Sequence, residues 1–172
     1  SLALRSAKKI SSIVEFGANV GMNMRALKLL YPQIQCRGIE INKKAALELR
    51  SVIGDNNVYN ESILEYQPES QCEVSMTKGV LIHINPDVLP IVYEKLYESS
   101  SRYILVGEYY NPSPVAIDYR GNTEKLYKRD FCGELLEAYA DLKMIDYGFV
   151  YKRDPAFSQD DLTWFLLEKT KL

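Results

Sequence analysis

The sequence has few of the side chains that hold metal ions. It contains one histidine, His83, and three cysteines, Cys36, Cys72 and Cys132, which lie far apart and form no paired motif. A structural zinc site needs four such ligands at short, regular spacings, so no metal site is expected. An odd number of scattered cysteines also gives no disulfide framework, and we expect a reducing, cytoplasmic compartment.

Long hydrophobic runs and an excess of one charge are absent as well. No apolar stretch approaches the roughly 20 residues of a membrane-spanning helix, and the first twelve residues lack the apolar core of a signal peptide. The net charge is −2 and the pI is about 5.6. Proteins that clamp nucleic acid usually gather Lys and Arg on one strongly positive face, so neither a membrane nor a nucleic acid is expected as a partner.

What remains is the composition of an ordinary globular protein. The chain has 172 residues, of which 47% are hydrophobic and 26% charged. This length suits one domain with a real core and is too short for two ordinary domains. We therefore expect residues 1–172 to form a single domain, and the sequence indicates no oligomeric state.

Apolar runs alternate with segments of helical periodicity along most of the chain. Buried strands are predicted at 12–16, 35–41, 57–60, 72–77, 103–107, 143–150 and 162–168, and helices at 22–31, 43–52, 85–96 and 130–139. Asn42 and Asp130 are expected to cap helices, and Pro90 to kink the third one. The tyrosine-rich stretch 108–128 is a polar insertion. This alternation predicts an α/β fold with a mostly parallel seven-stranded sheet, an antiparallel C-terminal hairpin and helices on both faces.

The most informative segment is Val14-Glu15-Phe16-Gly17-Ala18-Asn19-Val20-Gly21, at the first strand-to-helix turn. In a doubly wound sheet, ligands bind beyond the carboxyl ends of the strands, where this turn lies. The dinucleotide pattern G-x-G-x-x-G fails here, because Asn19 and Met22 occupy the second and third glycine positions. An acidic residue just before the turn also suits a cationic amino group better than a pyrophosphate, which disfavours NAD.

The pattern Glu15-x-Gly17-x-Asn19-x-Gly21 resembles motif I of class I S-adenosylmethionine-dependent methyltransferases, with Asn in place of the commoner middle glycine. The whole chain resembles the methylases associated with pseudaminic acid biosynthesis. The stretches that carry this likeness are VEFGANVGMNMRALKLLYP, GIEINKKAALELR, TKGVLIHINPD, YILVGEYYNPSPV, YRGNTEKLYKRDF and DDLTWFLLEK. The resemblance implies the Rossmann-like methyltransferase fold and S-adenosyl-L-methionine as cofactor. Because such folds usually place a helix or two before the first strand, we also expect the natural N-terminus to lie further upstream.

The same resemblance implies a set of cofactor-binding residues. Glu40 would accept the ribose hydroxyls, since a carboxylate has the two oxygens that a vicinal diol requires, and Ile41 would face the adenine. Either Glu61 or Ser62 would contact the adenine ring. The implied set is Glu15, Gly17, Asn19, Gly21, Glu40, Ile41, Ser62, Ile63, Thr77, Lys78 and Gly79. The alternatives are that the glycines serve only turn and packing, and that Asn19 is only a helix cap.

The reaction and the acceptor are less clearly marked. His83 follows the fourth strand and is a candidate general base, although it can equally be a core or capping residue. Candidate acceptor-binding residues are Tyr109, Tyr110, Asn111, Arg120 and Arg129; the tyrosines can instead pack under the insertion, and the basic cluster can be a solvated face.

The expected function is methyl transfer to oxygen or nitrogen of a small sugar-derived metabolite, such as a nucleotide-sugar, in pseudaminic acid or surface glycan biosynthesis. Two alternatives remain open at this stage. One is a non-catalytic protein of the same pathway that binds S-adenosylmethionine, and the other is a methyltransferase for a protein or a nucleic acid.

Overall fold

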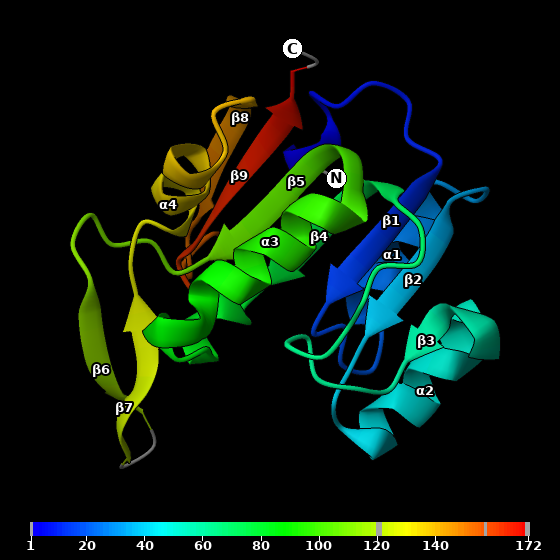
Figure 1. The fold of residues 1–172 in the computed structure, drawn as a ribbon, viewed down its shortest axis with the longest axis horizontal. Helices are drawn as coiled ribbons and strands as arrows, with labels where there is room; N and C mark the ends of the chain where they lie inside the picture. Colours follow the sequence, from blue (N-terminus) through cyan, green and yellow to red (C-terminus); the bar gives the residue numbers. More distant parts are fainter. Residues whose placement is uncertain (1, 120–121, 157, 171–172) are drawn as a thin grey trace.

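A single seven-stranded sheet organises the chain. The computed structural model describes residues 2–119, 122–156 and 158–170 (Figure 1). The strands are ordered β3-β2-β1-β4-β5-β9-β8; the first five run parallel, and β9 is antiparallel to both of its neighbours. Their bounds are β1 (Ser12–Phe16), β2 (Gln35–Ile39), β3 (Val58–Tyr59), β4 (Cys72–Lys78), β5 (Ser100–Glu108), β8 (Leu142–Val150) and β9 (Leu162–Lys169). The predicted sheet, with its antiparallel C-terminal pair, is confirmed.

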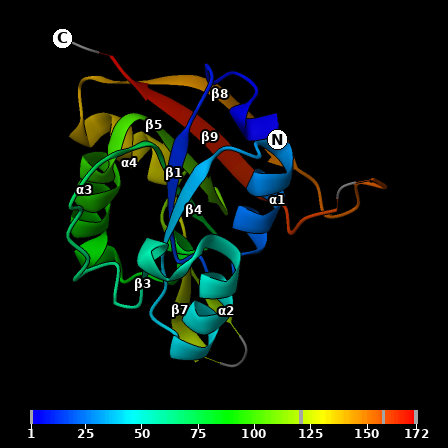
Figure 2. The same cartoon turned by 90° about the vertical axis from the view of Figure 1, so that its right-hand side faces the viewer.

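Helices cover both faces of this sheet, as expected. Helices α1 (Met22–Leu30) and α2 (Lys43–Ile53) pack on one face, and α3 (Leu89–Ser99) and α4 (Phe131–Ala138) on the other; Figure 2 shows α1 opposite α3 and α4, with the sheet between them. Each face buries its own hydrophobic cluster. The central strands β1, β4 and β5 are buried on both sides, and the apolar run Tyr103–Val106 of β5 is the composition expected of such a strand.

The helix N-termini test two predictions, the cap at Asn42 and the kink at Pro90. The Asn42 side chain accepts hydrogen bonds from the backbone N–H groups of Lys44 and Ala45, at 3.0 and 3.2 Å, so its predicted capping role is confirmed. The prediction for Pro90 was wrong. Asn85 caps a short 3₁₀ turn, Pro86–Val88, and α3 begins only at Leu89. Pro90 therefore lies in the first helical turn, where a missing N–H costs nothing, and it causes no kink.

Two further details differ from the expectation. Strand β2 ends at Ile39, so Glu40 and Ile41 lie in the loop that follows it. The polar insertion contains a two-stranded hairpin, β6 (Val115–Tyr119) and β7 (Asn122–Lys128), which forms a separate small sheet. Figure 1 shows this hairpin projecting beyond the carboxyl end of β5.

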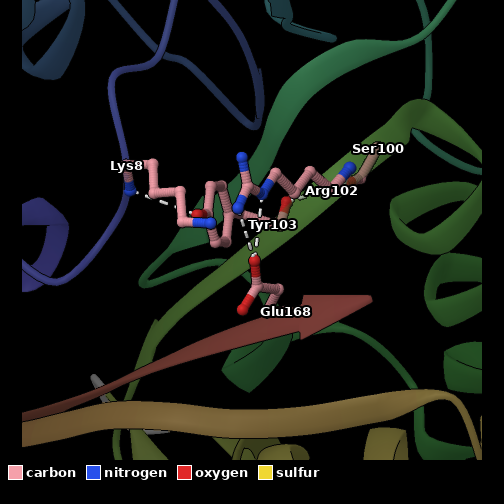
Figure 3. A network of polar contacts seen from close by, with 5 residues as sticks. All are labelled: Lys8, Ser100, Arg102, Tyr103 and Glu168. Atoms are coloured by element: carbon pink, nitrogen blue, oxygen red, sulfur yellow. Dashed lines mark hydrogen bonds and ion pairs between the residues drawn. The ribbon is translucent and has the colours of Figure 1, made fainter. Parts of the chain in front are cut away.

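A polar network fastens the opposite, amino-terminal end of β5 (Figure 3). The Arg102 guanidinium donates two hydrogen bonds to Oε1 of Glu168 on β9, at 2.9 and 2.8 Å. The Tyr103 hydroxyl accepts a 3.1 Å bond from the backbone N–H of Lys8, in the segment before β1. These contacts tie the end of the sheet that is remote from the candidate site.

The described part of the chain contains no helix that is both long and apolar enough to cross a bilayer. Nor do three or more His, Cys, Asp or Glu side chains gather as a metal-binding group among the described residues. Cys36, Cys72 and Cys132 are all buried as free thiols.

Candidate cofactor and acceptor site

The turn between β1 and α1 lies where the chain reverses its direction of strand addition. β2 pairs with β1 on one side and β4 pairs with it on the other, so the carboxyl end of β1 is the switch point of the sheet. Gly17 adopts a φ of 72°, and a Cβ there would lie 2.5 Å from Cγ2 of Val80. Gly17 is thus required both by its conformation and by the close approach of the loop after β4.

Packing also explains the second glycine of the motif. Gly21 has a φ of 80°, and a Cβ there would lie 2.8 Å from Cδ1 of Leu49, so the start of α1 approaches α2 closely. Asn19 adopts a φ of 49°, a left-handed conformation that Asn tolerates better than most residues. Its side chain does not cap α1, whose N-cap residue is Gly21.

Glu15 is a buried carboxyl at the end of β1. One oxygen, Oε1, accepts a hydrogen bond from Nδ2 of Asn23 at 2.5 Å. The other, Oε2, is buried and has no donor among the described residues. Burial raises the pKa of Glu15 to about 7, against the smaller lowering effects of Asn23 and the Lys78 cation. An unpaired carboxylate oxygen of this kind suits a donor supplied by a ligand.

Glu40 joins the turn after β1 to the loop after β2. Its Oε2 accepts a hydrogen bond from the Asn19 backbone N–H at 2.8 Å, and its Oε1 accepts one from the Asn42 N–H at 2.7 Å. The side chain is 8% exposed. Each carboxylate oxygen can accept more than one bond, so both remain able to accept hydroxyl donors.

The loop after β3 completes the same edge of the sheet. Asn60 donates from Nδ2 to the backbone carbonyls of Glu40 and Ile41, at 2.7 and 3.2 Å, and so holds the loop after β2 in place. Ile41 is 69% exposed. Glu61, Ser62 and Ile63 are half-buried beside it, and Ser62 forms a turn by accepting hydrogen bonds from later residues.

The segment after β4 lies next to Gly17 through the Val80 contact. Gly79 has a φ of 66° and donates its N–H to the Gly107 carbonyl at 2.9 Å. His83 ends a 3₁₀ turn, Leu81–His83, and its side chain is exposed, so it is not a core residue.

The predicted acceptor-binding residues lie between β5 and α4. Tyr109 is half-buried under the Lys128 ammonium, which lies 5.2 Å from the ring centre, whereas Tyr110 is 42% exposed. The Asn111 side chain bonds to the Ser113 carbonyl. Arg129 forms an ion pair with Glu134 at 2.5 Å, so an acceptor anion would compete with that carboxylate. Arg120 lies outside the described residues.

An apolar cavity opens between α1 and the sheet, beside the segment after β4. Its volume is about 430 Å³, within the range of small-molecule sites. Its lining is mostly apolar and comes from α1 and from four strands, β4, β5, β8 and β9; Thr77 and Lys78 of β4 also line it. The lining includes Ala26, Leu27, Leu30, Met76, Leu105 and Trp164.

Sequence reasoning missed three polar residues that shape this edge. Asn23 and Asn60 each bond to a predicted site residue, and Glu108 ends β5 with its carboxyl buried against the segment after β4. Asn23 lies in α1 just after the motif turn, and Asn60 lies in the loop after β3 beside the predicted Ser62 and Ile63; these positions were the local signal for each. Glu108 offered none, because its partners are some 30 positions earlier in the chain.

Comparison with solved structures identifies the fold. The chain superposes on 1,6-didemethyltoxoflavin-N1-methyltransferase of Burkholderia thailandensis with a TM-score of 0.76 and 13% identity, over 99% of this chain and 76% of that one. The fold is that of the class I methyltransferases.

Other matches have the same fold. An S-adenosylmethionine-dependent methyltransferase of Clostridium acetobutylicum gives a TM-score of 0.70 at 9% identity, over 99% of this chain and 88% of its own. An O-methyltransferase from a polyketide synthase of Brevibacillus brevis also gives 0.70, at 15% identity, over 94% and 67%. No protein-family model and no curated protein matches the sequence.

Proposed function

We propose that this chain is an S-adenosylmethionine-dependent methyltransferase that acts on oxygen or nitrogen of a small molecule. The observation that carries the proposal is the pair of buried carboxyls, Glu15 and Glu40, at the ends of neighbouring strands on either side of the Gly17 turn. The Burkholderia and Brevibacillus structures have S-adenosylhomocysteine bound, which supports the same cofactor here.

The residues present fit that cofactor. Glu40 has two oriented oxygens for a ribose diol, because backbone N–H groups fix the carboxylate at both ends. Glu15 has a buried oxygen that lacks a donor, and an ammonium group would provide one. Asn19, Gly17 and Gly21 would form the turn around it, with Ile41, Ser62 and Ile63 toward the adenine and Thr77, Lys78 and Gly79 toward the methionine part.

When bound, S-adenosylmethionine supplies an electrophilic methyl group, so the protein mainly has to position the acceptor. Alignment of this kind can lower a barrier by about 7–11 kcal/mol. His83, the exposed residue of the turn after β4, stays a candidate base.

The acceptor is proposed from two lines of support that point in different directions. The sequence resemblance favours a sugar-derived metabolite, with Tyr109, Tyr110, Asn111 and the basic residues of the insertion around it. The hydrocarbon lining of the 430 Å³ cavity favours an acceptor with an apolar face. An acceptor that combines both, such as a sugar joined to an apolar group, would satisfy the two.

The test is calorimetric titration with S-adenosylhomocysteine of the wild-type chain, Glu40→Ala and, as a control, Glu48→Ala. Glu48 is exposed on α2, so its loss should leave binding unchanged. We expect micromolar binding that only Glu40→Ala abolishes. A folded wild-type chain that does not bind would refute the proposal. Binding of the cofactor without turnover of any acceptor screened would favour the non-catalytic alternative. Salt-dependent binding to a polyanion would favour a nucleic-acid substrate.

A further inference from the structure

The Glu108 side chain crosses from the end of β5 to the segment after β4. It is 2% exposed, and its Oε1 accepts three hydrogen bonds. The donors are Oγ1 of Thr77 at 3.1 Å, the N–H of Val80 at 3.0 Å and the N–H of Leu81 at 3.1 Å. One oxygen thus holds both ends of the Thr77–Leu81 segment.

The 3₁₀ turn at the end of this segment has no side-chain cap at its N-cap residue. The 3₁₀ turn Leu81–His83 starts after Val80, whose side chain provides no capping bond. Backbone N–H groups at a helical start need an acceptor when they are buried, and Leu81 is fully buried. Glu108 supplies that acceptor from a different strand, so it acts as a remote cap of the turn.

The conformation that Glu108 maintains is unusual. Between the bonded residues, Gly79 adopts a φ of 66°. The Val80 side chain lies so close to the Gly17 turn that a Cβ on Gly17 would clash with it. A shift of the segment after β4 would therefore move Val80 relative to the motif turn. Both sides of the proposed methionine-binding region depend on where Glu108 holds this loop.

We propose that Glu108 is a positioning residue for the methyl donor, which fixes the Thr77–Leu81 segment against the Gly17 turn in the conformation that binds the cofactor. This inference rests on the proposed function. Glu108 also leads directly into Tyr109–Asn111, so the same carboxyl links the donor-side loop to the acceptor-side segment.

The test compares Glu108→Ala, Glu108→Gln and Val106→Ala by calorimetry with S-adenosylhomocysteine and by hydrogen exchange of the Val80 and Leu81 amides. Val106 lies two residues earlier on the same face of β5 and is 1% exposed, so its truncation reports general loss of core packing. We expect Glu108→Ala to weaken binding by about tenfold to a hundredfold, the equivalent of losing two or three hydrogen bonds to this carboxyl, and to speed exchange at both amides. Glu108→Gln keeps an acceptor oxygen and should restore both properties, and Val106→Ala should change neither.

Wild-type affinity in a folded Glu108→Ala chain would overturn the proposal, as would an equal loss of affinity in Val106→Ala. Should Glu108→Ala not fold, Glu108→Asp replaces it, because the shorter side chain keeps the charge but cannot reach all three donors. Absence of binding by the wild-type chain would instead refute the proposed function, and the amide exchange rates would still decide whether Glu108 fixes the loop.

Discussion

Gly17 and Gly79 have similar backbone conformations in different surroundings. Their φ values are 72° and 66°, but a Cβ at Gly17 would lie 2.5 Å from Val80, whereas a Cβ at Gly79 would meet nothing within 4 Å. A left-handed conformation costs an L-residue roughly 1–2 kcal/mol, and overpacking adds about 1–3 kcal/mol. An alanine at Gly79 would therefore add backbone strain alone, whereas an alanine at Gly17 would add both strain and a steric clash.

We predict that Gly17→Ala lowers the free energy of unfolding by about 2–4 kcal/mol and Gly79→Ala by about 1–2 kcal/mol, because only the first adds a clash. Urea denaturation of both variants measures the difference. Adding Val80→Ala to Gly17→Ala should recover the clash component. Equal losses in the two single variants would show that the contact with Val80 relaxes freely.

Residues differ in how well the sequence alone identifies them. Glu15 and Glu40 were implied by the resemblance to class I methyltransferases, and both lie near the carboxyl end of a predicted parallel strand, where ligands bind in such sheets. Glu108 also ends a strand, yet the N–H groups that bond to its carboxyl lie 27 and 28 positions earlier in the chain. No local pattern predicts which distant loop a buried carboxyl will cap.

At the scale of elements, β6 and β7 are strands that the sequence did not predict. Their segment lacks the continuous hydrophobic runs of the central sheet, since it forms an outlying pair of strands, and it therefore read as a polar insertion. One residue of β7, Leu126, is buried in the cluster beneath α3 and α4, whereas its cross-strand partner Ile117 on β6 is 37% exposed. The hairpin is thus anchored to the body of the protein through β7.

We predict that Leu126→Ala destabilises the protein by about 2–5 kcal/mol, the range for truncating a buried leucine, and that it increases proteolytic cleavage within the hairpin. Ile117→Ala, in the same hairpin but exposed, should change stability by less than about 0.5 kcal/mol. Limited proteolysis together with urea denaturation would test both. A hairpin cut at the same rate in both variants would mean that Leu126 does not anchor it.

At the scale of the whole molecule, the fold was predictable because the alternation of apolar strands with amphipathic helices is repeated along the chain. Seven apolar segments interrupted by helical periodicity allow few arrangements, and right-handed crossovers exclude most of the rest. Individual boundaries, such as the end of β2 or the start of α3, moved by two to four residues without altering the order of the strands. The candidate site follows from that order, which brings the ends of β1, β2 and β4 to one edge.

Two of the buried carboxyls, those of Glu15 and Glu108, allow a prediction about the pH dependence of stability. Burial raises the pKa of both Glu15 and Glu108 to about 7 from an ordinary value of 4.5. Between these pH values the folded chain holds protons that the unfolded chain has released, so stability should fall as the pH rises from about 5 to 7 and then level off. Each group should contribute on the order of 1–3 kcal/mol. Urea denaturation between pH 5 and 8 measures the slope.

Substituting the carboxyls one at a time tests whether they cause that slope. Glu15→Gln and Glu108→Gln cannot ionise, so each should flatten part of the pH dependence. Glu73→Gln is the matched control, because hydrogen bonds from Ser11 lower the pKa of this carboxyl. Its contribution is present above the ordinary carboxyl pKa and is lost only as the pH falls through the lowered value. The slope between pH 5 and 8 should therefore survive in Glu73→Gln, and a slope that also survives in both buried variants would assign the pH dependence to other groups.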